Sequence, residues 1–186
     1  MSLFEERFGP WKPIRRGAAI AWLVAYALFF LYALANSSGF LFIDFANLAI
    51  HEAGHPFFGL FGSYGLMILG GTLAELLVPF LCAAYFFFRR EIAGFAFAMF
   101  WLFENFLYIG TYMSDARALA LPLVGSGDHD WNILFGLWGV LPRDTAIGSA
   151  TRFLGWVGML VVWIWLAWRA FRASEGPAPG AANRSG

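Results

Sequence analysis

The chain has 186 residues, of which 60% are hydrophobic and only 13% are charged, and its formal net charge is zero. Soluble domains carry about 25% charged residues, so this composition excludes an ordinary soluble domain and indicates a helical membrane protein. The neutral charge balance gives no support to a nucleic-acid partner, and the single Cys82 excludes an internal disulfide and a cysteine-based metal site.

Five stretches are long and apolar enough to be predicted as membrane-spanning helices. They cover residues 17–35, 39–61, 66–88, 92–113 and 147–171. The segment before the first helix, residues 1–16, mixes aromatic with basic side chains and is predicted to be an interfacial anchor. We expect the first helix to stay uncleaved, because its apolar run exceeds that of a signal peptide. The predicted fold is an all-α, polytopic transmembrane helical bundle over residues 17–172.

The rest of the chain is expected to lie outside the spanning helices. Residues 131–141 are apolar but too short to span, which predicts a re-entrant or interfacial segment. Residues 173–186 are rich in Gly, Pro, Ala and Ser and are predicted to be a disordered tail. With five spans, six Lys and Arg residues fall on one side of the membrane and five on the other, so the sequence does not favour an orientation.

The second predicted helix carries the motif His51-Glu52-Ala53-Gly54-His55. Histidines four residues apart lie one turn apart on one helix face, so both rings can bind one metal ion. Glu52 lies at the edge of that face, where it can act as general base on a zinc-bound water. Charged and polar side chains are costly at membrane depth, and a divalent cation offsets that cost. The motif therefore predicts a Zn²⁺ site.

The same helix face continues towards the N-terminus. Asn47 and Asp44 lie four and seven residues before His51 and are candidates for hydrogen-bond partners of the imidazole groups. The alternative for Asp44 is a solvated position near the start of the helix.

A catalytic zinc site requires a third protein ligand besides the two histidines and water. The candidates are Asp115, Glu104, Glu75 and His129. His129 lies in a polar, glycine-flanked loop and is alternatively a transition-state donor oriented by Asp128 or Asp130, or a solvated loop residue. Glu75, one turn before Pro79, is interpreted as a structural or protonated buried acid.

The region from Phe42 to Arg117 resembles the site-2 protease family of intramembrane zinc metalloproteases. The five-residue motif matches the first motif of that family, and Gly70-Gly71 matches a glycine-rich segment loosely. The second motif is matched by the Asn and the Asp of the stretch 105–115, which lacks the prolines and the following glycine. The resemblance implies a zinc ion held by His51, His55 and Asp115, with Asn105 in a supporting position.

These observations predict an integral, multi-pass membrane protein that hydrolyses peptide bonds in or near the transmembrane segments of other proteins. Glu52 takes a proton from the attacking water and passes it to the leaving amine. Two alternatives use the same residues. One is a zinc-dependent membrane hydrolase acting on a lipid, and the other is a non-catalytic metal-binding membrane protein. The sequence gives no oligomeric state.

Overall fold

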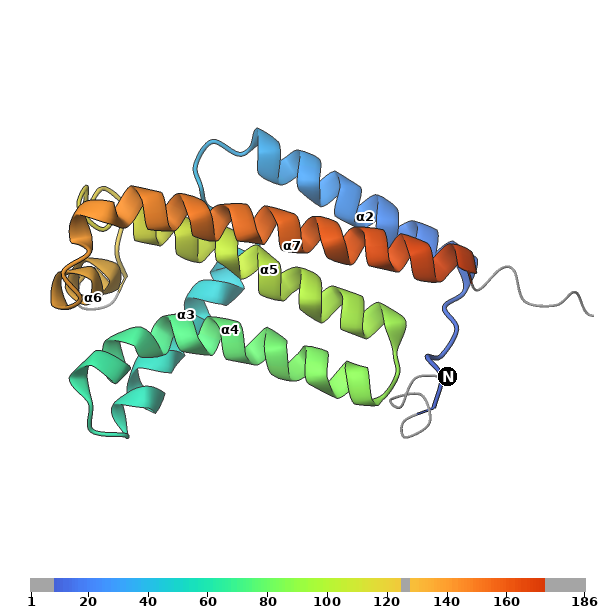
Figure 1. The fold of residues 1–186 in the computed structure, drawn as a ribbon, viewed down its shortest axis with the longest axis horizontal. Coiled ribbons are helices and arrows are strands. Elements are labelled where there is room, and N and C mark those ends of the chain that lie inside the picture. Colours follow the sequence, from blue (N-terminus) through green and yellow to red (C-terminus); the bar gives the residue numbers. More distant parts are fainter. Residues whose placement is uncertain (1–8, 125–127, 173–186) are drawn as a thin grey trace, which may run out of the picture.

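The computed structural model describes residues 9–124 and 128–172, and these fold into a helical bundle (Figure 1). Its elements are α2 (Arg16–Ala35), α3 (Asp44–Gly59), α4 (Tyr64–Phe88), α5 (Ile92–Ser114), α6 (Asp130–Leu137), the 3-10 turn η1 (Leu141–Arg143) and α7 (Asp144–Arg172). The predicted all-α bundle is confirmed. Most of the predicted N-terminal anchor, residues 1–8, and the predicted tail, residues 173–186, lie outside the described residues.

Among the described residues, four helical stretches, rather than the five predicted, are long and apolar enough to cross a membrane. They are Arg16–Ala35, Tyr64–Phe88, Ile92–Ser114 and Leu141–Phe171. The second predicted span differs because the chain does not become helical until Asp44, and α3 has only 16 residues. At a rise of about 1.5 Å per residue α3 is about 24 Å long, which is less than the thickness of a bilayer core of about 30 Å.

Three of the long helices, α2, α5 and α7, pack around an apolar core. The ring of Tyr26 on α2 stacks on that of Phe100 on α5 at a centroid distance of 4.2 Å. Met159 and Leu166 of α7 are fully buried in the same core. The backbones of α5 and α7 approach closely where Gly110 faces Gly148, because a Cβ on either would collide with the carbonyl oxygen of the other. Small residues at such positions allow membrane helices to approach closely.

The second part of the bundle is formed by α3, α4 and α6. Helix α3 crosses α4 where Gly54 meets Gly70, and a Cβ on Gly54 would collide with the carbonyl group of Gly70. Helix α6 covers one end of α4 and α5, where its Leu134 and Phe135 are buried with Ile68 of α4. The apolar segment predicted at 131–141 is therefore a short helix that closes one end of the bundle (Figure 1).

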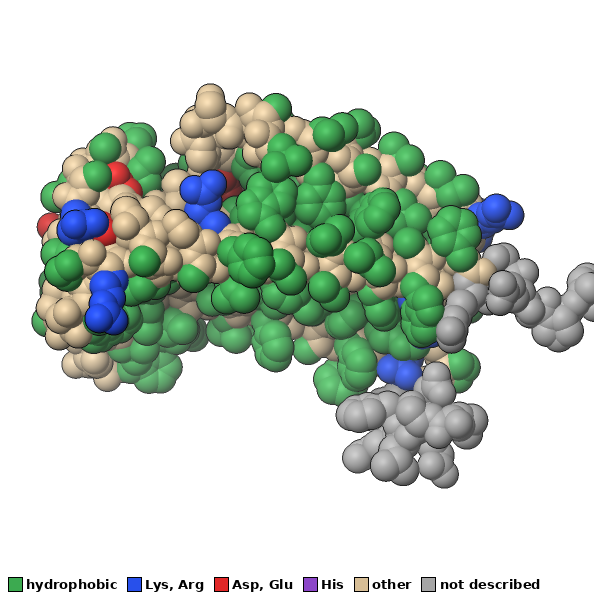
Figure 2. All heavy atoms as spheres, turned by 45° about the horizontal axis from the view of Figure 1, so that its top comes forward, with side chains coloured by type: hydrophobic (Ala, Val, Ile, Leu, Met, Phe, Trp, Pro, Cys, Tyr) green, Lys and Arg blue, Asp and Glu red, His purple; other side chains and the backbone are tan. Residues whose placement is uncertain are grey.

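The kind of side chain on the surface also changes along the long axis of the molecule. Figure 2 shows hydrophobic side chains over the middle of one face, with most of the charged side chains towards the two ends. Many large hydrophobic side chains of the long helices are exposed, including Leu31 of α2, Phe80 of α4 and Val161 of α7. An apolar belt of this kind fits contact with lipid rather than water.

Candidate metal centre

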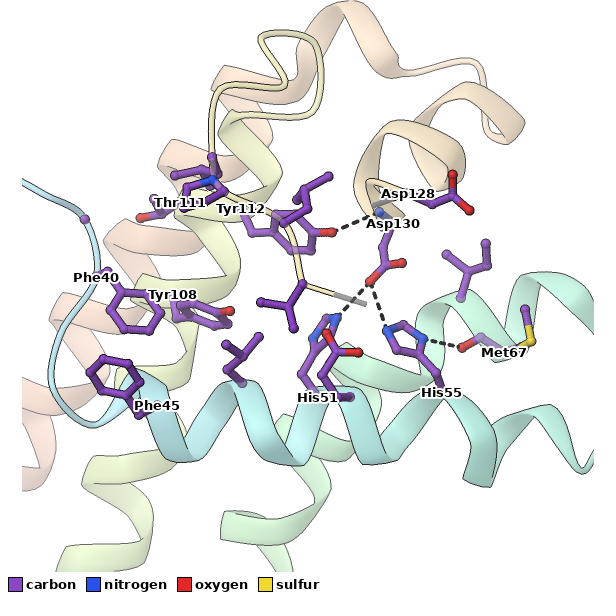
Figure 3. A pocket seen from close by; sticks show the side chains of 18 of the residues that line it. Phe40, Phe45, His51, His55, Met67, Tyr108, Thr111, Tyr112, Asp128 and Asp130 are labelled. Carbon is purple, nitrogen blue, oxygen red and sulfur yellow. Dashed lines mark hydrogen bonds and ion pairs between the residues drawn. The ribbon is translucent and has the colours of Figure 1, made fainter. Parts of the chain in front are cut away.

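The two histidines of the motif lie on one face of α3 and point to the same place (Figure 3). The centroids of the His51 and His55 rings are 4.8 Å apart, and the rings are nearly perpendicular. The Nε2 atom of His51 lies 2.8 Å from Oδ2 of Asp130, and the Nε2 atom of His55 lies 3.3 Å from the same oxygen. Two imidazoles and one carboxylate from distant parts of the chain therefore converge on one point.

The second ring nitrogen of each histidine has its own partner on α4. Nδ1 of His55 lies 3.0 Å from the carbonyl oxygen of Met67. Nδ1 of His51 lies 3.2 Å from Oε1 of Glu75, an ion-pair distance, although the two groups are not aligned as a hydrogen bond. Glu75 is 1% exposed. A carboxylate or carbonyl at the second nitrogen fixes which nitrogen carries the proton and leaves Nε2 free for a ligand.

The His51 ring is also held by the close packing of α3 and α4. A Cβ on Gly71 would lie 2.5 Å from Nε2 of His51, so any larger residue would displace the ring. Gly54 allows the crossing of the two helices one turn further on. The motif glycine and the Gly70-Gly71 pair therefore bring the backbone of α4 against the histidine-bearing face of α3.

Asp130 is the first residue of α6, and neighbouring groups fix its position. Its backbone N–H donates to the hydroxyl of Tyr112 at 3.0 Å, and Nδ2 of Asn132 donates to the carbonyl oxygen of Ala116 at 2.7 Å. Burial would raise the pKa of Asp130, but hydrogen bonds with His51 and His55 hold it below its usual value. The carboxylate is therefore held in its charged form beside the two imidazoles.

Asp115, the third ligand implied by the family resemblance, is placed away from the two rings. Its carboxylate accepts hydrogen bonds from the backbone N–H groups of Ala120 and Leu121. Its Oδ2 atom lies 3.5 Å from Nε2 of His129. In this structure Asp115 shapes the turn after α5, and it is Asp130 that approaches His51.

His129, a second candidate ligand, is buried beside Asp130 rather than solvated. Its Nδ1 atom accepts the N–H of Asn132 at 3.2 Å, which caps the N-terminus of α6. Its ring lies 4.2 Å from that of Tyr112, and burial lowers its pKa below the usual value. These contacts connect α6 to the end of α5.

Glu104, the third candidate, belongs to a separate buried cluster deeper in the bundle. Nδ2 of Asn47 donates to Oε2 of Glu104 and to Oδ1 of Asp44, both at 3.0 Å. Oδ1 of Asn47 accepts the indole N–H of Trp101 at 2.8 Å. Asn105 donates to the carbonyl oxygen of Trp101 at 3.2 Å. The predicted supporting residues Asn47 and Asn105 therefore bind groups of this cluster, and the solvated alternative for Asp44 is wrong, since that residue is 1% exposed.

A cavity of about 860 Å³ opens in front of the histidines, and His51, Glu52, His55 and Asp130 line it. The rest of its wall is mostly apolar or aromatic and includes Phe45, Leu48, Ile68, Tyr108, Tyr112 and the stretch 121–124. Polar groups are thus gathered at one place in an otherwise apolar cleft, which is the usual make-up of a ligand site.

The donor atoms fit a divalent metal by type and spacing. One ligand atom from each of His51, Glu52 and His55 can be chosen so that all lie within 4.8 Å of one another. Ligand atoms about 2.1 Å from a tetrahedral zinc ion are about 3.4 Å apart. The 3.3 Å from Asp130 Oδ2 to Nε2 of His55 is close to that spacing, whereas the 2.8 Å to Nε2 of His51 is a hydrogen-bond distance that would lengthen on metal binding. Nitrogen and carboxylate donors in this number are typical of zinc.

Comparisons of the chain with protein-family models, with curated proteins and with solved structures each find no match. Asp130 was not predicted as a partner of the two histidines, and Glu75 was considered as a ligand but interpreted as a structural acid and not as a partner of His51. One signal was available for Glu75, because an acid inside an apolar span is by default a functional candidate. The signal for Asp130 was its place at the start of a short apolar helix.

Proposed function

We propose that the chain is a multi-pass membrane protein and a zinc metallopeptidase whose metal ligands are His51, His55 and Asp130. The observation that carries the proposal is the convergence of both Nε2 atoms on one Asp130 oxygen, with Glu52 beside them at the wall of the cavity. Asp130 thereby replaces Asp115 as the proposed third ligand, since the carboxylate of Asp115 is bound to the backbone of Ala120 and Leu121.

A bound divalent metal supplies a Lewis acid, which lowers the pKa of a water molecule to about 7 and polarises a carbonyl group. The remaining chemistry belongs to the chain. Glu52 follows His51 directly, and one of its carboxylate oxygens lies within 4.8 Å of a ring nitrogen of each histidine, so it would lie beside a metal held by them. It accepts the proton of the attacking water and delivers it to the leaving amine, while the water oxygen bonds to the carbonyl carbon and the C–N bond breaks.

The supporting residues keep the two imidazoles in one orientation. Glu75 faces Nδ1 of His51 and the Met67 carbonyl faces Nδ1 of His55, so each ring presents Nε2 to the cavity. Carboxylate and carbonyl partners of this kind fix the ring and strengthen it as a ligand. Glu75 acts through His51 and is a positioning residue in the proposed centre.

The cavity favours an apolar substrate in an extended conformation. Its aromatic and aliphatic wall matches apolar side chains, and the polar groups that converge on one point are those of the two histidines and Asp130. Helical peptide carbonyls are blocked by their own hydrogen bonds, so a transmembrane segment must unwind locally before it can be cleaved. The proposed substrate is therefore an apolar, unwound segment of a membrane protein.

The test combines metal analysis with hydrolysis by the purified full-length protein in detergent. The probe is fluorescently labelled casein, an unfolded protein, with phosphatidylcholine vesicles as a parallel probe for lipid hydrolysis. We expect one zinc per chain, release of peptides, and no fatty acid. Glu52→Gln should keep the zinc and lose about 10²- to 10⁴-fold in rate, which is the usual contribution of a general base.

The partly exposed Glu91, which pairs with Lys12 at the opposite end of the bundle, provides the matched control, and Glu91→Gln should keep full activity. Full peptide hydrolysis by zinc-loaded Glu52→Gln would overturn the mechanism. Release of fatty acid with intact casein would replace the peptidase with the lipid hydrolase, and zinc without any hydrolysis would favour a metal-binding protein.

A further inference from the structure

Three segments far apart in the sequence meet at one end of the bundle. Nζ of Lys12 lies 3.1 Å from Oε1 of Glu91, which connects the chain before α2 to the turn between α4 and α5. Nε of Arg90 donates to the carbonyl oxygen of Gly9 at 2.9 Å. The guanidinium of Arg169, near the end of α7, lies 5.4 Å from the Trp11 ring centroid. The start of α2, the α4–α5 turn and the end of α7 therefore share one end.

The opposite ends of the four long helices also lie together. Helix α2 runs antiparallel to α7, because Leu23 contacts Trp163 whereas Phe30, further along α2, stacks on Trp156. Helix α4 runs for 25 residues from Tyr64 to the α4–α5 turn. Helix α5 runs back for 23 residues, so its end at Ser114 lies at the same end of the bundle as Tyr64. Helix α3 connects the end of α2 to the start of α4. The α3–α4 connection lies at that second end (Figure 1), and the α2–α3 connection lies beside the last turns of α5, since a Cβ on Gly39 would be 3.1 Å from Cγ2 of Thr111.

This arrangement changes how the Lys and Arg residues divide between the two sides of the membrane, compared with the five-span prediction. Because α3 does not carry the chain across, the N-terminal segment and the 114–146 region no longer lie on the same side. Six described Lys and Arg side chains now belong to the first end, namely Lys12, Arg15, Arg16, Arg89, Arg90 and Arg169. The half of the bundle towards the second end has three among the described residues, Arg117, Arg143 and Arg152.

We infer that the first end, here called the basic end, faces the cytoplasm, and that the metal centre opens on the opposite side of the membrane. Lys and Arg close to the ends of spanning helices are retained on the cytoplasmic side. The anionic lipid headgroups of the cytoplasmic leaflet attract such side chains. Trp11, Trp165 and Trp168 lie among these cations, as expected for an interfacial aromatic belt.

The metal centre lies close to the second end and not midway through the bundle. Met67, whose carbonyl faces His55, is in the first turn of α4, and Tyr112, whose hydroxyl binds Asp130, is in the last turn of α5. Water and an unwound substrate therefore have a short path to the cavity from the non-cytoplasmic side. The inference about orientation rests on the spans and their charges, and it holds whether or not the centre is catalytic.

The test uses single-cysteine variants of the full chain in which Cys82 is replaced by alanine. Pro13→Cys marks the basic end and Gly136→Cys marks α6; both positions are exposed, and a Cβ at Gly136 meets no atom within 4 Å. A membrane-impermeant maleimide should label Gly136→Cys in intact cells. It should label Pro13→Cys only after the membrane is made permeable.

A second readout does not depend on thiol reactivity. Green fluorescent protein fused after residue 186 should fluoresce, and alkaline phosphatase fused at the same place should be inactive, because only the phosphatase requires export. An active phosphatase fusion, labelling of Pro13→Cys in intact cells, or equal populations of both orientations would each overturn the inference. Failure of the orientation leaves the zinc content and the effect of Glu52→Gln unchanged, so it is distinguishable from failure of the proposed function.

Discussion

Two buried polar clusters lie on the same helix face, only one turn apart, and they differ in what surrounds them. The cluster of Asp44, Asn47 and Glu104 lies between α3 and α5 and is held by hydrogen bonds among its own members and to Trp101. The cluster of His51, His55 and Asp130 lines a cavity of about 860 Å³. Both bring carboxylates into an apolar bundle, and only the second combines them with imidazoles and open space.

The difference shows that a buried acid does not by itself mark a reactive site. In the first cluster the Asn47 amide donates to both carboxyl groups and so satisfies acceptors that burial would otherwise leave costly. In the second, two nitrogen atoms point at one carboxylate oxygen, and a cation would offset the cost of bringing these groups together. Variants in each cluster should therefore differ in whether they affect metal binding or only stability.

The largest effect is expected from Asp130→Asn. Loss of a charged ligand should weaken zinc binding by more than about 100-fold, the upper end of the effects of merely supporting residues, with a similar loss of activity. Zinc per chain is measured by mass spectrometry after dialysis against a weak chelator. Asp115→Asn is the matched variant and should keep its zinc, because Asp115 binds the backbone of Ala120 and Leu121. The opposite result would identify Asp115 as the ligand.

A smaller effect on metal binding is expected from Glu75→Gln. Neutralising the partner of Nδ1 of His51 should weaken zinc binding by roughly 10- to 100-fold while the coordinating residues stay in place. Glu104→Gln changes an equally buried acid in the other cluster and should leave zinc affinity unchanged. Competition with a fluorescent chelator measures both. Equal losses in the two variants would mean that Glu75 acts through general packing and not through His51.

Close packing of α3 against α4 is the next target. A methyl group at Gly54 would collide with the Gly70 carbonyl, and overpacking of this kind typically costs 1–3 kcal/mol. We expect Gly54→Ala to lower the thermal unfolding midpoint in detergent and to reduce zinc content. Gly65→Ala is the control, since its Cβ would meet no atom within 4 Å. A stable, fully metallated Gly54→Ala would show that the two helices can separate without disturbing the histidines.

Much of the fold follows from the sequence, because apolar length is a local property. Four of the five predicted spans agree with helices of the structure to within a few residues. The exception is the span predicted at 39–61, which is not helical at its start. There the chain from Asn36 to Phe42 is held by side-chain contacts, such as the Phe42 N–H donating to the Tyr32 hydroxyl. That error affects the whole topology. With one span fewer, the N-terminal segment and the 114–146 region lie on opposite sides of the membrane, and the Lys and Arg residues are no longer divided almost equally.

In the candidate site, too, the local features were predictable from the sequence and the long-range contacts were not. His51, Glu52 and His55 could be placed together from spacing alone, because one helix carries them. The contact of Asp130 with them spans 79 residues and depends on how α6 packs over the end of α5. Asp115, His129 and Asp130 lie within 15 residues of one another in the sequence, and only the fold shows which of them turns towards the histidines.

The smallest effect is expected at His129, where the variants distinguish a zinc ligand from a residue that only caps α6. His129→Ala removes the acceptor of the Asn132 N–H and should destabilise the protein by about 1 kcal/mol, the usual cost of losing a helix N-cap. His129→Asn restores a capping oxygen and should recover most of that stability, as measured by thermal unfolding. Both variants should keep one zinc per chain, because the ring of His129 contacts Asp115 and Tyr112 instead of the cavity histidines. Zinc loss in both variants, whatever their stability, would make His129 a ligand and reduce Asp130 to a hydrogen-bond partner.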